Sequence, residues 1–135
     1  MKTDVNIKGK ISELEVLTKV TKLGYSVSIP FGDKEKYDQI WDINNKLLKV
    51  QVKTARWKND EHTGIVFNCY SVSNGKKHQY TKQDIDYFAV YWDNECYLLP
   101  VEICSSDKTL WLVPKNNPSC CLAKDYILEE VLKTI

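Results

Sequence analysis

The feature that most constrains the fold of this chain is residues 37–54, YDQIWDINNKLLKVQVKT, which have the pattern of a β-hairpin. Two runs with alternating or continuous apolar character flank Asn44 and Asn45, and asparagine tolerates the positive φ angles that a two-residue hairpin turn requires. With these two residues as the loop, Ile43 pairs with Lys46, and the register of the whole hairpin follows by counting outwards.

This register divides the hairpin into two faces, because side chains alternate along a strand. The apolar face, which other elements must cover, carries Trp41, Ile43, Leu48, Val50 and Val52. The polar face carries Asp38, Asp42, Lys49, Gln51 and Lys53. Counting places Asp38 opposite Gln51, and facing residues have Cβ atoms roughly 4.5–5.5 Å apart. We therefore expect a carboxylate, an amide and an ammonium group to converge on one point.

Size and composition indicate the class of protein. A chain of 135 residues, 43% hydrophobic and 27% charged, suits a single globular domain over residues 1–135. No apolar run approaches the roughly 20 residues of a membrane helix, and the first ten residues lack a signal-peptide core, so we expect a cytoplasmic protein with no membrane partner. The five cysteines lack C-x-x-C spacing, which favours free thiols over disulfides or a zinc site.

Residues 9–24 predict the first helix, with Ser12 as its cap and Gly24 at its end. Its apolar stripe consists of Val16, Leu17, Val20 and Leu23. Glu13 belongs to the same stripe in helical projection, so its carboxylate points inwards and needs a cation or hydrogen-bond donors. The alternative is a first-turn acid that interacts favourably with the helix dipole.

The remainder of the chain predicts mainly strands. We expect strands at residues 25–31, 64–72, 87–92, 96–101 and 110–113, a helical turn at 81–86 and a final helix near 122–132. Two helices around six or seven hairpin-connected strands indicate an α+β fold with a mostly antiparallel sheet.

The basic residues give a weaker signal for nucleic-acid binding. The net charge is only +1, and Arg56 is the single arginine among 19 basic residues, so contacts to phosphates are favoured over reading of guanine. The candidates for DNA contact are Lys36, Arg56, Lys58, Lys76 and Lys77. The alternative is that these residues belong to solvated loops and a solvated hairpin tip.

Glu13, Asp38, Gln51 and Lys53 form the candidate site. Two carboxylates and an amide oxygen are hard ligands that suit Mg²⁺, which typically takes one or two protein carboxylates. Beside such a metal, Lys53 can orient a water nucleophile or stabilise charge on a scissile phosphate. The alternative is an exposed polar sheet face on which Asp38 and Lys53 form a cross-strand ion pair.

These residues resemble the PD-(D/E)XK nuclease superfamily, and most closely its branch similar to group I intron-encoded homing endonucleases. The likeness, over about residues 9–101, rests on Ser12-Glu13, on the run P-x-G-D-x-x-x-Y-D at 30–38, on V-Q-V-K-T at 50–54 and on D-Y-F-A at 86–89. Two positions depart from the superfamily pattern: Gln51 replaces its acid, as in this branch, and Tyr37 precedes Asp38 in place of proline.

The resemblance implies a restriction-endonuclease-like fold, with a mixed, mostly antiparallel central sheet flanked by helices. It also implies roles for the site: Asp38 is the principal metal ligand, Gln51 supplies a second oxygen, Glu13 completes the site directly or through water, and Lys53 is the catalytic cation. The expected cofactor is Mg²⁺, for which Mn²⁺ can substitute.

The function expected from this reading is metal-dependent, homing-endonuclease-like hydrolysis of double-stranded or branched DNA. A homodimer or homotetramer is expected, because one site cuts one strand. The alternatives are a Holliday-junction resolvase or restriction-type nuclease of the same fold, a non-cleaving DNA-binding module of this fold, and a protein-interaction domain.

Overall fold

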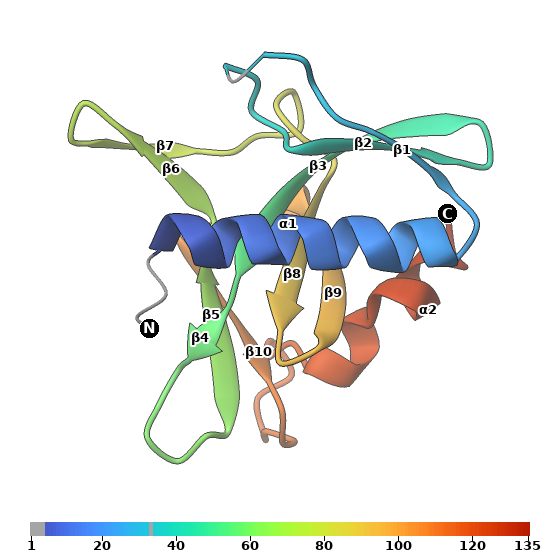
Figure 1. The fold of residues 1–135 in the computed structure, drawn as a ribbon. Coiled ribbons are helices and arrows are strands. Elements are labelled where there is room, and N and C mark those ends of the chain that lie inside the picture. Colours follow the sequence, from blue (N-terminus) through green and yellow to red (C-terminus); the bar gives the residue numbers. More distant parts are fainter. Residues whose placement is uncertain (1–4, 33) are drawn as a thin grey trace.

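The computed structural model describes residues 5–32 and 34–135, and it has an α+β fold built on one five-stranded sheet (Figure 1). Asp33, part of the run at 30–38, lies outside the described residues. The sheet has the order β1-β2-β3-β8-β9, with strands β1 Ser26–Ser28, β2 Gln39–Ile43, β3 Lys46–Thr54, β8 Tyr87–Trp92 and β9 Glu95–Pro100. Only β3 and β8 pair in parallel within it. The predicted mixed, mostly antiparallel sheet is confirmed.

The hairpin forms with the predicted turn and register. Asn44 and Asn45 have φ angles of 52° and 69°, and Ile43 pairs with Lys46. The five residues of the predicted apolar face are all buried: Trp41, Ile43, Leu48, Val50 and Val52. The ladder ends one residue earlier than expected, at the pair of Gln39 with Val50, so Asp38 lies just before β2.

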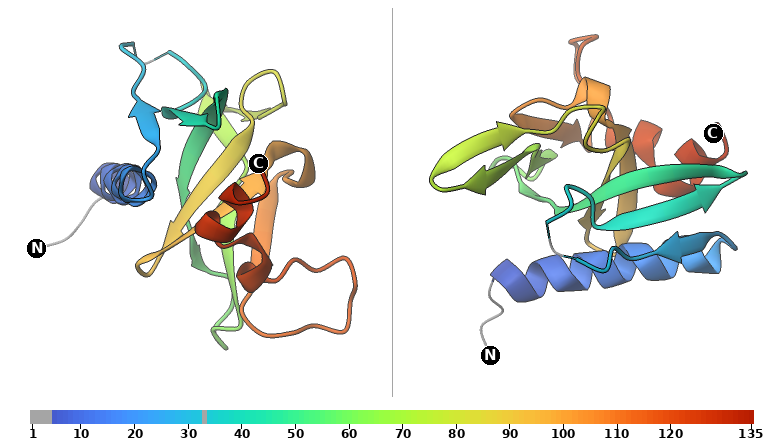
Figure 2. Two further views of the ribbon diagram at one scale, coloured as in Figure 1. Left: turned by 90° about the vertical axis from the view of Figure 1, so that its right-hand side faces the viewer. Right: turned by 90° about the horizontal axis from the view of Figure 1, so that it is seen from above.

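Two cores cover the two faces of the central sheet. On one face, helix α1 (Val5–Lys22) packs through Val16 and Val20 against the apolar face of the hairpin. Helix α2 (Leu128–Leu132) adds Leu128 and Leu132 to this core from the β9 side. Figure 2 (left) shows α1 end-on beside the sheet, with β10 (Asp107–Trp111) on the opposite side.

The second core lies under a smaller sheet of order β10-β5-β4, in which β4 is Arg56–Trp57 and β5 is Gly64–Asn68. Strands β6 (Tyr70–Ser73) and β7 (Lys76–Gln79) form a separate hairpin that projects from the body of the molecule (Figures 1 and 2). The remaining elements are two short 3₁₀ helices, η1 (Val101–Ile103) and η2 (Ala123–Tyr126).

Several predicted boundaries were wrong. Helix α1 extends back to Val5, and Ser12 is a buried residue inside it rather than its cap. Leu23, expected in the buried stripe, follows the helix and is 40% exposed. The strand expected at residues 25–31 is limited to β1.

The later elements are also more divided than the sequence indicated. The strand expected at residues 64–72 is split between β5 and β6, which belong to different sheets, so the described residues contain ten strands rather than six or seven. The helix expected at 122–132 is divided into η2 and α2, because Ile127 is extended, with ψ 129°. The turn at 81–86 is present, with the N–H groups of Asp84 and Ile85 donating to the Thr81 carbonyl.

All five cysteines are free thiols, as predicted. Of the helices in residues 5–32 and 34–135, none combines the length and the apolar character needed to cross a membrane.

Candidate active site

The four predicted site residues line one groove of about 630 Å³ between the first half of α1 and strand β3. Glu13 comes from α1, Asp38 from the residue before β2, and Gln51 and Lys53 from β3. Each of the four side chains is partly buried. Three separate segments of the chain therefore contribute polar groups to one solvent-accessible hollow.

Asp38 is held against β3 by two hydrogen bonds. Its N–H donates to the Val50 carbonyl at 2.8 Å, and its Oδ2 accepts the Val52 N–H at 3.0 Å. Burial raises the pKa of Asp38, and the Val52 N–H and the Lys53 ammonium offset that rise only in part. The carboxylate is thus fixed in position but incompletely compensated in charge.

Glu13 adds a second carboxylate to the same groove. Burial raises the pKa of Glu13, the neighbouring Asp38 raises it further, and Lys10 has a smaller opposing effect. A carboxylate whose ionisation is disfavoured by burial and by a neighbouring carboxylate is stabilised by a proton or by a nearby cation. The inward orientation predicted from the helical projection is therefore present, and a simple first-turn acid does not describe Glu13.

Lys53 supplies the positive charge of the groove. Its Nζ donates to the Tyr70 carbonyl at 3.2 Å and lies 5.3 Å from the centroid of the Tyr80 ring. Burial lowers the pKa of Lys53, against the opposing effect of Asp38. Among the described residues no ion pair within 4.0 Å joins Lys53 to Asp38, so the cross-strand ion pair considered from the sequence does not form.

Gln51 lies between these groups on β3. Its Nε2 donates weakly to the Val52 carbonyl at 3.4 Å, and the amide oxygen is the atom of this side chain that can ligate a metal. No group of three or more His, Cys, Asp and Glu side chains in residues 5–32 and 34–135 is arranged to hold a metal ion. Two carboxylates and an amide oxygen still fit a hard cation that retains several waters, as Mg²⁺ does.

Of the five predicted DNA-contacting residues, one lines the groove and four lie on other segments. Arg56 lines the groove itself, and its guanidinium donates to Asn68 Oδ1 at 3.2 Å. Lys58 follows β4, Lys36 precedes β2, and Lys76 and Lys77 lie on β7. All five are exposed, and none forms an ion pair with an acid in the part of the chain that the structure describes.

Two residues near the site were not predicted. Lys8 lines the groove from the first turns of α1, which begins before the helix start expected at residue 9. The spacing of Ile7, Ile11 and Leu14 could have indicated the earlier start. Tyr80 is buried below Lys53, and burial raises the pKa of Tyr80 to about 12. No periodic pattern marks Tyr80.

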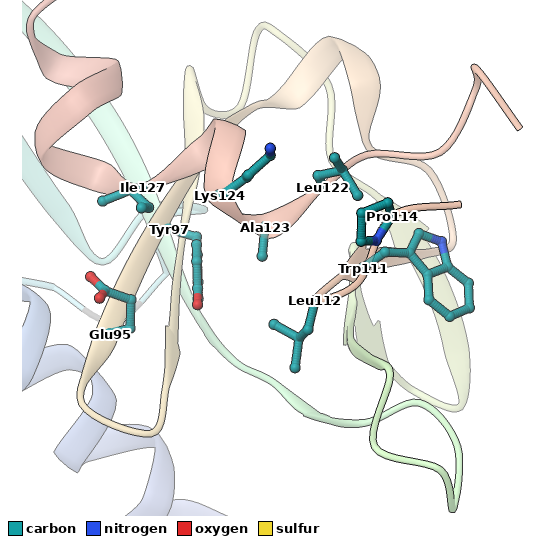
Figure 3. Close-up of a pocket in the computed structure, with 9 residues that line it drawn as sticks. All are labelled: Glu95, Tyr97, Trp111, Leu112, Pro114, Leu122, Ala123, Lys124 and Ile127. Carbon is teal, nitrogen blue, oxygen red and sulfur yellow. The ribbon is translucent and has the colours of Figure 1, made fainter. Parts of the chain in front are cut away.

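A second hollow, of about 320 Å³, lies between β9, the end of β10 and η2 (Figure 3). It is lined mostly by apolar side chains, including Tyr97, Trp111 and Leu122, with Glu95 and Lys124 as its charged members. None of the residues predicted for catalysis or DNA contact lines this hollow.

Comparisons with known proteins identify the family. No curated protein matches the chain. Among solved structures, a bacterial homing endonuclease, I-Ssp6803I, has a similar fold, with a TM-score of 0.80 and 22% sequence identity over 98% of this chain and 95% of that one. This likeness shows a restriction-endonuclease-like fold. The model of the PD-(D/E)XK endonuclease family matches residues 3–124, and the chain therefore belongs to that family of nucleases.

Proposed function

We propose that this protein is a Mg²⁺-dependent endonuclease that hydrolyses phosphodiester bonds of DNA, with its active site in the groove lined by Glu13, Asp38, Gln51 and Lys53. The observation that carries the proposal is the pair of half-buried carboxylates, each with a raised pKa, beside a lysine and an amide. A divalent cation would offset the repulsion between the two carboxylates. Such a cation can also activate water for phosphodiester hydrolysis.

Each residue has a distinct part in the proposed reaction. Asp38 and Glu13 would hold the metal through carboxylate oxygens, and Gln51 through its amide oxygen. The metal, when bound, supplies Lewis-acid activation of water and of the phosphate. Lys53 donates hydrogen bonds from its ammonium group to the attacked phosphate or the incoming water, in a groove where partial burial strengthens these electrostatic interactions.

DNA contact would come from Lys36, Arg56, Lys58, Lys76 and Lys77. Lysine-rich contacts favour the phosphate backbone, so these residues would position a duplex or a branched DNA across the groove. The similar fold of a bacterial homing endonuclease supports a homing-type DNA substrate for this protein. A Holliday-junction resolvase or a restriction-type nuclease shares the same site and differs in the shape of DNA it accepts.

We also infer a homodimer or homotetramer. One groove cuts one strand, so cleavage of a duplex needs a second copy. Large apolar side chains are exposed on α1 and on the segment after β1: Ile11, Leu14, Ile29 and Phe31. Light scattering coupled to size exclusion tests this assembly, and a monomer at micromolar concentration that still makes double-strand breaks in one encounter contradicts it.

The experiment that tests the nuclease is a cleavage assay on supercoiled plasmid, linear duplex and four-way-junction DNA, each with Mg²⁺, Mn²⁺ or a chelator. We expect nicking or linearisation with either metal and none with the chelator. Preference for the junction would favour the resolvase. Absence of metal-dependent cleavage of all three substrates contradicts the proposal.

A non-cleaving DNA-binding module is the second candidate, and Gln51 is the observation that favours it. An amide in place of an acid removes one negative charge from the metal site and weakens its attraction for a cation. This candidate predicts salt-sensitive DNA binding without cleavage, with a slope that reports several phosphate contacts. A Gln51→Glu variant that gains cleavage absent from the parent would support it.

A further inference from the structure

Two polar side chains, those of Ser12 and Gln39, are buried to 1% exposure, and they are the buried polar residues of the described part of the chain. Burying a hydroxyl or an amide is unfavourable unless it is hydrogen-bonded, so such residues are retained for a specific contact. Both lie where α1 packs against the β2–β3 hairpin. Ser12 directly precedes Glu13 in the chain, and Gln39 is hydrogen-bonded to the main chain of Glu13.

Gln39 joins the main chain of Glu13 to β2. Its Nε2 donates to the Glu13 carbonyl at 2.8 Å, and its Oε1 accepts the Nε1–H of the fully buried Trp41 at 2.9 Å. These two bonds determine which way the amide faces, because a flipped amide would present its NH₂ to the indole N–H. The residue that follows Asp38 is thereby tied to the helix at Glu13.

Ser12 makes the corresponding contact to β3. Its Oγ lies 2.6 Å from Oγ1 of Thr54, the residue that follows Lys53. Helix α1 is therefore joined to both strands of the hairpin at two consecutive residues, Ser12 and Glu13. On the strands, the joined residues are the immediate neighbours of Asp38 and Lys53.

We propose that Gln39 and the Ser12–Thr54 pair are positioning residues that hold the Glu13 carboxylate against Asp38, so that both reach the same divalent cation. This inference rests on the proposed metal site. The two carboxylates repel each other in the metal-free protein, so a helix without these contacts would relax in the direction that separates them. Groups that orient metal ligands in this way typically change metal affinity by roughly 10- to 100-fold.

The test is a calorimetric titration of the metal-free protein with Mn²⁺ in the absence of DNA. Gln39→Met keeps the side-chain length but cannot hydrogen-bond, and we expect its Kd for Mn²⁺ to rise about tenfold. Thr54→Val keeps the shape but loses the hydroxyl, and we expect a rise of about fivefold, whereas Thr54→Ser should stay within about twofold of the parent. Leu110→Val, in the β10 core, controls for a general loss of stability.

Steady-state cleavage gives a second readout. The Mg²⁺ concentration for half-maximal rate should rise in Gln39→Met and Thr54→Val, while KM for DNA at saturating Mg²⁺ stays at the parent value. A merely structural role would instead lower the amount of active protein and leave the Mg²⁺ dependence unchanged.

The Asp38→Ala variant distinguishes failure of the positioning role from failure of the metal site itself. If Asp38→Ala loses Mn²⁺ binding while Gln39→Met and Thr54→Val bind like the parent, the positioning role is wrong and the metal site stands. If Asp38→Ala itself binds like the parent, the metal site is wrong and the positioning role fails with it. Should Gln39→Met fail to fold by circular dichroism, the Thr54→Val and Thr54→Ser pair at an exposed position decides alone.

Discussion

The groove beside α1 and the hollow of Figure 3 differ in the charges of the residues that line them. The groove beside α1 brings the like charges of Glu13 and Asp38 together, and each carboxylate has a raised pKa. The hollow of Figure 3 has an apolar lining with one acid, Glu95, and one base, Lys124. Convergent carboxylates are costly without a cation, whereas an apolar lining is ordinary in a folded protein. The charges of its lining, rather than its being hollow, are therefore what mark the groove beside α1 as the proposed site.

The largest difference in cleavage rate is expected between a variant of the groove, Asp38→Ala, and a variant of the second hollow, Glu95→Ala. Asp38→Ala removes a carboxylate of the proposed metal site, and we expect cleavage to fall by roughly 10³-fold or more. Glu95→Ala, which removes the acid of the second hollow, should keep at least half of the parent rate. Gel-based nicking of plasmid DNA under Mg²⁺ measures both. Equal loss in the two variants would remove the distinction between the hollows.

The next largest difference is expected in kcat, between Lys53→Met in the groove and Lys124→Met in the second hollow. Lys53→Met keeps the aliphatic stem but removes the charge proposed to face the scissile phosphate, and we expect kcat to fall by roughly 10²- to 10³-fold with little change in DNA affinity. Lys124→Met is the matched control and should leave kcat unchanged. Single-turnover cleavage and a filter-binding assay separate the two parameters. A loss confined to DNA affinity would make Lys53 a binding residue only.

Removing Arg56 should have a smaller effect, and on binding rather than on catalysis. Arg56→Gln deletes one proposed phosphate contact in the groove, so we expect DNA affinity to fall a few-fold and the salt slope of binding to decrease by about 1. Lys115→Gln, on the exposed chain near Trp111, is the control. An unchanged salt slope in Arg56→Gln would place the duplex elsewhere on the surface.

The smallest expected effect is on thermal stability, and its sign is unusual for a mutation at a half-buried position. A carboxyl whose pKa is raised by folding contributes stability at low pH, and this contribution is lost as the pH rises through the folded-state pKa. Burial raises the pKa of Asp38. In the absence of metal, Asp38→Asn should therefore raise Tm by about 3 °C at pH 7 and by less at pH 4.

Differential scanning calorimetry at both pH values measures this difference. Asp42→Asn, at an exposed position on β2, is the control and should change Tm by less than about 1 °C. A Tm that falls in Asp38→Asn at pH 7 would show that the Val52 N–H bond outweighs the electrostatic cost of burying the carboxylate.

The parts of the fold set by local chemistry were predictable. The positive φ angles at Asn44 and Asn45 determine the hairpin register, and side-chain alternation then places Gln51 and Lys53 on one face. Glu13 could be placed because an acid within an apolar helical stripe must find compensation. These local rules sufficed to bring four residues from three segments into one groove.

The parts that depend on distant contacts were not predictable. The parallel pairing of β3 with β8 has no local signal, because it joins residues 50–54 to residues 87–91. Ser12 is a cap-type residue, and only the packing of α1 against β3 shows that its hydroxyl serves Thr54 instead. Strands β5 and β6 are separate because they belong to two different sheets, and the local sequence does not indicate this.

The central position of β3 has a consequence for how the site opens. Residues 46 to 50 of β3 pair with β2 and residues 50 to 54 pair with β8, so Gln51 and Lys53 are held on the β8 side. Asp38 lies outside the β2 ladder and is joined to β3 by its bonds to Val50 and Val52. Local openings at the end of a ladder cost less free energy than opening of paired strands, so we expect Asp38 to be released before Gln51 and Lys53. Loss of the site under mild denaturant should begin at Asp38.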